Sequence, residues 1–145
     1  MILLDTTVLV YAVGGDHPLR ESCANLVAAI GAGSLSATTT VEVLQEFAHV
    51  RARRRGRQDA ADLAEHYAAL LSPLGEVGNG DLADGLGLYR SHDELGCFDA
   101  VLAAVVLNRD HITALVSADR AFGKVEGLRQ IDPAQVEAWT DDVTR

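Results

Sequence analysis

Four acidic residues border or interrupt apolar stretches of this chain, and their type and placement could support chemistry. They are Asp5, Glu46, Asp99 and Asp119. Burying a carboxylate costs free energy unless a cation or several hydrogen bonds compensate it. The neighbouring sequence offers these four no fixed cationic partner. Because hard divalent cations prefer oxygen ligands, a divalent metal ion is a candidate for gathering the four carboxylates.

The elements that must position these residues alternate between short strands and helices. Strands are predicted at residues 2–4, 35–38, 113–117 and 128–131, with a further short strand at 76–77. Helices are predicted from residue 17, with Asp16 as a cap, to 31 or 33, and at residues 40–53, 58–71, 81–92, 99–109 and 133–139. The helix that starts at residue 99 is apolar nearly all round, which predicts a buried position. This alternation is typical of an α/β fold with a parallel sheet covered by helices on both faces.

Such a sheet would bring distant acidic residues to one edge. Asp5 and Asp119 each follow a predicted parallel strand, and ligands of parallel sheets bind outside the carboxyl ends of the strands. Asp99 lies at the start of a helix, where the positive end of the helix dipole tolerates an anion. Each of the three is also a good cap for a helix or turn. Their convergence favours a site over three separate caps.

Composition limits the classes of protein that fit. The 145 residues predict one domain spanning 1–145, and a hydrophobic fraction of 48% predicts a globular protein. No apolar run approaches the length of a membrane span. The beginning of the chain lacks the pattern of a signal peptide. With two cysteines outside any CxxC motif, Cys23 and Cys97, a cytoplasmic location with reduced thiols is expected.

An arginine cluster stands out against a net charge of −9. Five of the twelve basic residues fall within seven positions: Arg51, Arg53, Arg54, Arg55 and Arg57. Arginine forks match phosphate and carboxylate oxygens, so the cluster could bind RNA or an acidic partner. Alternatively, these cations only complement the dipole at a helix C-terminus.

Other catalytic patterns have little support. The five histidines form no HxxxH or HExxH motif, and neither GxxxxGK[ST] nor GxGxxG occurs. A haloacid-dehalogenase-like phosphatase would require a second aspartate two residues after Asp5, where the chain has Thr7. A response-regulator receiver would require a strand-end lysine, and the only lysine, Lys124, is poorly placed.

Four segments, in order, resemble the PIN-domain ribonucleases of the VapC type, the nuclease half of bacterial VapBC toxin–antitoxin pairs. The opening ILLDTTVLVY is similar to that family's hydrophobic–Asp–Thr–Ser signature. The segments TTTVEVLQEF, GCFDAVLAA and LVSAD resemble its second, third and fourth acidic segments. The resemblance spans nearly the whole chain, with two departures. Thr7 replaces the usual serine, and Glu42 or Glu46 could fill the second acidic position; the alignment favours Glu46.

The resemblance implies a PIN-like three-layer α/β/α sandwich with a mostly parallel sheet, and metal-dependent hydrolysis of RNA. Asp5 and Asp99 would be the ligands of Mg²⁺ or Mn²⁺. Glu46 and Asp119 would complete the shell or orient the attacking water. Thr6 and Ser117 would support a carboxylate or phosphate by hydrogen bonding, although strand-end capping is an alternative. Four carboxylates are also compatible with two metal ions.

Partners are implied by the resemblance as well. A small VapB-type antitoxin would hold the toxin inactive, and the acidic net charge suits a basic antitoxin segment. Homodimerisation is typical of the family. The competing hypotheses are a non-catalytic PIN-like binding module, in which the acids are caps, and a phosphatase-like metal-dependent hydrolase.

Overall fold

The sheet has four parallel strands in the order β2-β1-β3-β4. The computed structural model describes the backbone of residues 1–138 and the side chains of residues 1–135. The strands are β1 (Ile2–Leu4), β2 (Ala37–Thr38), β3 (Ala114–Val116) and β4 (Gln130–Ile131). Their side chains are almost all buried, as expected for a parallel sheet covered on both faces.

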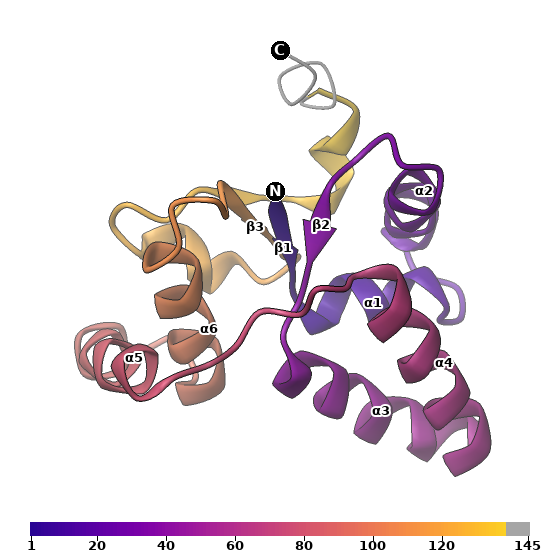
Figure 1. Cartoon of the computed structure of the whole chain (residues 1–145), viewed down its shortest axis with the longest axis horizontal. Coiled ribbons are helices and arrows are strands. Elements are labelled where there is room, and N and C mark those ends of the chain that lie inside the picture. Colours follow the sequence, from indigo (N-terminus) through magenta and orange to yellow (C-terminus); the bar gives the residue numbers. More distant parts are fainter. Residues whose placement is uncertain (139–145) are drawn as a thin grey trace.

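Helices cover both faces of this sheet. They are α1 (Thr6–Ala12), α2 (Arg20–Gly31), α3 (Val41–Arg55), α4 (Arg57–Leu70), α5 (Asn79–Ser91) and α6 (Cys97–Leu107), with 3₁₀ turns η1 (Arg120–Lys124) and η2 (Pro133–Ala138). In Figure 1, α5 and α6 lie on one side of the sheet and α1 to α4 on the other. The α/β class and the three-layer arrangement are therefore confirmed. No helix within the described residues is long and apolar enough to cross a membrane.

Several details differ from the sequence-based prediction. Helix α1 was not predicted, because Thr6, Thr7 and Val8 favour strands when considered locally. Helix α2 begins at Arg20 rather than near residue 17, and Asp16 does not cap it.

Two further differences lie later in the chain. The predicted strand at 76–77 lies outside the sheet, next to an isolated bridge between Thr40 and Gly75. The last predicted helix is a 3₁₀ turn, and its predicted end, Trp139, lies outside the described residues.

The apolar helix α6 is clamped between the sheet and α5. Five consecutive residues, 102–106, are buried. Gly85 of α5 makes the close approach possible, since a Cβ there would lie 2.6 Å from the Cα of Val101. Helix α6 carries Asp99 in its first turn, so this contact fixes the element that presents Asp99.

We expect Gly85→Ala to destabilise the protein by about 1–3 kcal/mol, because the added methyl group forces α5 away from α6. Gly87→Ala is a matched control in the same helix. A Cβ at Gly87 meets nothing within 4 Å, so we expect this change to stabilise the protein by about 0.4–1 kcal/mol. Urea denaturation of both variants measures the difference. Equal changes in the free energy of unfolding for the two variants would show that the contact between α5 and α6 does not require glycine at position 85.

Candidate active site

One cleft of about 360 Å³ receives side chains from the carboxyl ends of β1 and β3 and from α1, α3 and α6. All four predicted acidic residues line it. The complete lining is Asp5, Thr6, Thr7, Val10, Tyr11, Glu46, Val50, Arg54, Asp99 and Asp119. The structure therefore brings together residues that are up to 114 positions apart in the sequence, from Asp5 to Asp119.

Asp5 is the most deeply buried acid of the cleft, with 3% of its surface exposed. Its backbone N–H donates to the Val116 carbonyl at 3.0 Å, which ties the end of β1 to β3. Ser117 Oγ donates to Asp5 Oδ2 at 2.7 Å, and Thr7 Oγ1 donates to the same oxygen at 3.1 Å. Burial nevertheless raises the pKa of Asp5. These hydrogen bonds orient the carboxylate without neutralising it.

Ser117 connects two of the acidic residues. Besides donating to Asp5, its Oγ accepts from the backbone N–H of Asp119 at 3.0 Å. Asp119 Oδ1 in turn accepts from the N–H of Ala121 at 2.9 Å. Asp119 therefore caps η1 and also lines the cleft, so its role as a cap is compatible with a role in the site. Ser117 is fully buried and supports the site from within the fold.

Asp99 is half-buried at the start of α6. Burial raises the pKa of Asp99 to about 7, and the nearby carboxylates of Asp5, Asp119 and Glu46 add to the shift. A cation that enters the cleft would stabilise the ionised form of this carboxyl group.

Glu46 and Glu42 have different surroundings. Thr6 Oγ1 donates to Glu46 Oε2 at 2.6 Å, which holds Glu46 at the cleft. Glu42 lies one helical turn away and lines a separate apolar hollow with Cys97 and Phe98. Among the described residues, Glu42 Oε2 is a buried oxygen without a hydrogen-bond partner. This placement supports Glu46 as the second acidic residue of the site.

A second buried aspartate shows what a structural carboxylate looks like in this fold. Asp81 is 4% exposed. It accepts two hydrogen bonds from Arg109, at 2.9 and 2.7 Å, and one from Asn108. Arg109 holds the pKa of Asp81 well below its usual range. Asp5 is equally buried, but its pKa is raised rather than lowered. The fold therefore pairs the buried carboxylate of Asp81 with a cation. Among the described residues, the carboxylate of Asp5 has no such partner, so it can bind a ligand.

The oxygen ligands of the cleft fit a hydrated divalent ion. Within the described residues, no three His, Cys, Asp or Glu side chains stand close enough to enclose an ion by themselves. Mg²⁺ commonly uses one or two carboxylates and keeps several waters or substrate phosphates as its other ligands. Two carboxylates with raised pKa values, Asp5 and Asp99, match that requirement.

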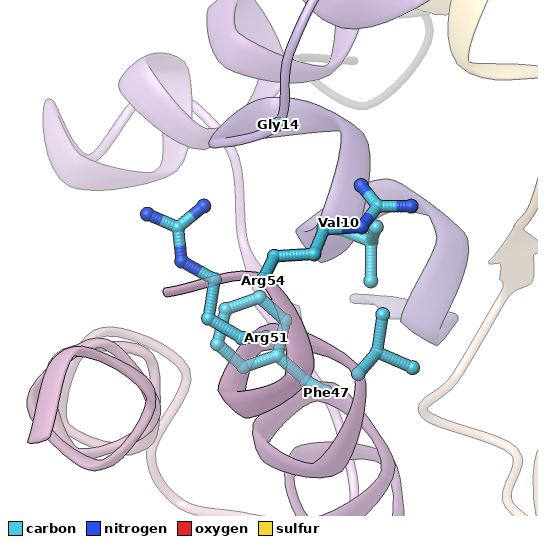
Figure 2. Close-up of a pocket in the computed structure, with 6 residues that line it drawn as sticks. Val10, Gly14, Phe47, Arg51 and Arg54 are labelled. Atoms are coloured by element: carbon cyan, nitrogen blue, oxygen red, sulfur yellow. The ribbon is translucent and has the colours of Figure 1, made fainter. Parts of the chain in front are cut away.

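The arginine cluster is divided among different surroundings. Arg51 forms an ion pair with Asp59, and its Nη1 donates to the Val13 carbonyl at 2.9 Å. Arg51 therefore joins α3 to α4 and to the end of α1, which separates it from the other predicted RNA ligands. Arg53 and Arg57 line a hollow between α3 and α4. Arg54 points to the opposite side from Arg51 (Figure 2) and lines the acidic cleft.

Four residues that line the cleft were not predicted to belong to the site. Thr7 is one of them, and its Oγ1 joins Asp5 to the backbone N–H of Ala118. Val10 and Tyr11 of α1 and Val50 of α3 are the others, and they form part of the wall. The available signal for a helix after β1 is Asp5, because aspartate is common at the residue before a helix and Asp5 holds that position before α1.

Comparisons with known proteins place this chain in a family. The PIN domain family matches residues 2–128. Ribonuclease VapC7 of Mycobacterium tuberculosis is 49% identical over 137 residues, which cover 92% of each chain. Ribonuclease VapC13 of the same organism is 31% identical over 134 residues, covering 90% of this chain and 99% of the relative.

A solved structure shares the fold at lower identity. The crystal structure of M. tuberculosis VapC20, described as a sarcin–ricin loop cleaving toxin, superposes with a TM-score of 0.69. It is 18% identical, and the match covers 85% of this chain and 93% of VapC20. With the family match, the two relatives and the four acidic segments in order, the chain belongs to the PIN-domain family and, within it, to the VapC type.

Proposed function

We propose that this chain is the toxin of a type II toxin–antitoxin pair, a ribonuclease that hydrolyses RNA phosphodiester bonds with Mg²⁺ or Mn²⁺. One observation carries the proposal. Two carboxylates with raised pKa values, Asp5 and Asp99, line the same cleft as Glu46 and Asp119. The Asp81–Arg109 pair shows that the fold can neutralise a buried carboxylate where structure alone requires it.

Asp5 and Asp99 would hold the metal ion, directly or through water. When bound, the ion supplies positive charge to the phosphate and lowers the pKa of a bound water. Ser117 and Thr7 keep Asp5 oriented through their hydrogen bonds. Glu46, held by Thr6, and Asp119 would complete the metal shell or orient the attacking water. The residues would thus divide into two metal ligands, Asp5 and Asp99, two acids that complete the shell or orient water, Glu46 and Asp119, and three hydroxyl groups. The hydroxyl groups of Thr6, Thr7 and Ser117 position Asp5, Glu46 and the Asp119 backbone.

The proposed partners are RNA, a VapB-type antitoxin and a second copy of the chain. The net charge of −9 suits a basic antitoxin segment. A homodimer is supported by large hydrophobic residues that are exposed, namely Val41, Leu82, Tyr89, Phe98 and Leu107. A cytoplasmic location suits both an RNA substrate and two free cysteines.

Cleavage of RNA by the purified protein tests the proposal. We expect cleavage in Mg²⁺ or Mn²⁺, its loss on addition of EDTA and its recovery when the metal is restored in excess. Asp99→Asn protein, purified in the same way, controls for contaminating ribonuclease. Cleavage that persists in EDTA would refute the metal-dependent mechanism. If RNA is bound but never cleaved, the chain is a binding module instead.

A further inference from the structure

The acidic cleft has a second wall that the proposed chemistry does not use. Val10 and Tyr11 of α1 and Val50 and Arg54 of α3 line it. This wall combines an aromatic ring, an apolar surface and a cation. The four carboxylates repel an RNA backbone wherever no metal ion screens them, so a cation and a ring beside them are suited to hold the substrate.

Arg54 is exposed, and its hydrogen-bond donors remain available. Its side chain extends beside Val10 and away from Arg51 (Figure 2), and it borders a small hollow that Val10, Phe47 and Val50 also line. The aliphatic part of an arginine commonly packs on apolar surface in this way, with the charged group left in water. Among residues 1–135, no carboxylate oxygen lies within 4.0 Å of the Arg54 guanidinium.

Arg51 and Arg53 of the same helix have different surroundings and do not line the acidic cleft. The guanidinium of Arg51 donates hydrogen bonds to Asp59 and to the Val13 carbonyl. Arg53, the immediate neighbour of Arg54, faces the hollow between α3 and α4 and does not line the acidic cleft. A free guanidinium fork matches phosphate oxygens. Arg54 is therefore the arginine of the cluster best placed to bind a phosphate beside the carboxylates.

Tyr11 presents a ring that is already fixed. It is half-buried and stacks on His17, with ring centroids 3.9 Å apart and an interplanar angle of 11°. The His17 ring is itself held, because its Nδ1 accepts from the backbone N–H of Leu19 at 3.1 Å. A ring that is fixed before binding loses little conformational freedom when a base stacks on it. Stacking on aromatic rings is the usual way proteins hold unpaired bases.

We propose that Tyr11 and Arg54 form a nucleotide-binding subsite beside the four carboxylates, in which Arg54 binds a backbone phosphate and Tyr11 stacks on the base of an adjacent nucleotide. This inference rests on the proposed ribonuclease function. A base that stacks on Tyr11 cannot at the same time be stacked within a duplex.

The phosphate contact is tested by RNA binding across several salt concentrations. The probe is a fluorescein-labelled single-stranded RNA of about 12 nucleotides, with Ca²⁺ in place of Mg²⁺ to limit cleavage. We expect Arg54→Gln to weaken binding and to reduce the log–log salt slope by about 0.7. The matched control Arg53→Gln removes the same charge from the neighbouring position and should leave the slope nearly unchanged. Equal slopes for the two variants would overturn the role of Arg54.

The stacking contact is tested by combining Tyr11 variants with abasic RNA. Moving one abasic nucleotide along the probe should reveal a position that weakens wild-type binding about 5- to 100-fold. Tyr11→Leu should bind the intact probe with the same loss and should no longer respond to the abasic position. Tyr11→Phe should bind like the wild type. The stacking proposal is overturned if the losses of RNA affinity caused by Tyr11→Leu and by the abasic nucleotide add up. It is also overturned if no abasic position weakens binding by the wild type.

Two outcomes separate this proposal from its alternatives. If both variants bind RNA normally but lose binding to the antitoxin, the wall is an antitoxin surface and the subsite is refuted. If wild-type protein neither binds nor cleaves RNA with a divalent ion, the proposed function itself fails. The abasic scan of the wild type needs no variant, so the stacking proposal stays testable even if Tyr11→Leu folds poorly.

Discussion

Asp99→Asn should lower RNA cleavage by at least about 10²-fold and should raise the stability of the metal-free protein. Asparagine keeps the shape of the side chain but loses the charge that holds a divalent ion. Only a loss beyond about 100-fold exceeds the roughly 10- to 100-fold effect of changing a residue that merely supports a metal ligand. Cleavage rates at matched Mg²⁺ concentration measure the first effect, and thermal unfolding in EDTA measures the second.

The sign of the stability effect follows from the pKa of Asp99. The pKa is about 7 in the folded protein and has an ordinary value of 3.8. Between these values the folded state binds more protons than the unfolded state, so stability falls as pH rises through this window. Above pH 7 the full loss of folding stability caused by Asp99 is present. After allowance for solvent screening, we expect Asp99→Asn to recover about 1–2 kcal/mol there, and little below pH 4.

Metal provides the matching control. Mg²⁺ should stabilise the wild type, because it relieves the repulsion around Asp99, and should stabilise the Asn variant much less. A purely structural role for the Asp99 charge at the start of α6 predicts the opposite pattern, since losing a negative charge in the first turn of a helix lowers stability by about 0.3–1 kcal/mol. A variant that unfolds more easily in EDTA and still cleaves RNA would therefore show that Asp99 is a structural residue.

Glu46→Gln should lower kcat by about 10²-fold, whereas Glu42→Gln should change it less than about threefold. Glu46 lies in the acidic cleft and is held by Thr6 at 2.6 Å. Glu42 borders the apolar hollow beside Phe98. Both are glutamates of α3 one turn apart, so each variant controls for changes in helix propensity and net charge.

Steady-state cleavage of one RNA substrate by both variants decides between these residues. A selective loss of kcat at Glu46, with KM little changed, would indicate a residue that acts in the transition state. The reverse order of the two variants would move the second acid of the site one turn towards the start of α3. Comparable losses at both positions would mean that α3 itself, rather than one carboxylate, sets the geometry of the cleft.

The local pattern of the sequence was sufficient for the sheet and for the edge at which the acids meet. The short runs at residues 2–4 and 113–117 are mostly apolar and too short for helices, so they favour buried strands, and alternation with helices favours a parallel arrangement. Their carboxyl ends then share one edge, which places Asp5 and Asp119 together. The apolar surface all round α6 predicted its burial. These predictions succeeded because hydrophobic periodicity is read from adjacent residues.

Contacts between distant segments decided the rest. Helix α1 forms from residues with a local preference for strands, since packing of Val8 and Leu9 in the core overrides that preference. Glu42 and Glu46 share a helix and a residue type, and only the positions of Thr6 and Phe98 distinguish their surroundings. The same holds for Arg51, Arg53 and Arg54, which share one short segment of α3 and differ in what lies opposite them.

The sequence by itself determined the chemistry available to this protein: an oxygen-rich acidic set, an arginine cluster and the strands that align them. The tertiary structure alone decided which charges remain free. Asp81 meets Arg109 and Arg51 meets Asp59, whereas Asp5 and Arg54 meet no opposite charge within 4.0 Å among the described side chains. The physical reason is that the free energy of a charge depends on neighbours within a few ångströms, and folding brings those neighbours from distant parts of the chain.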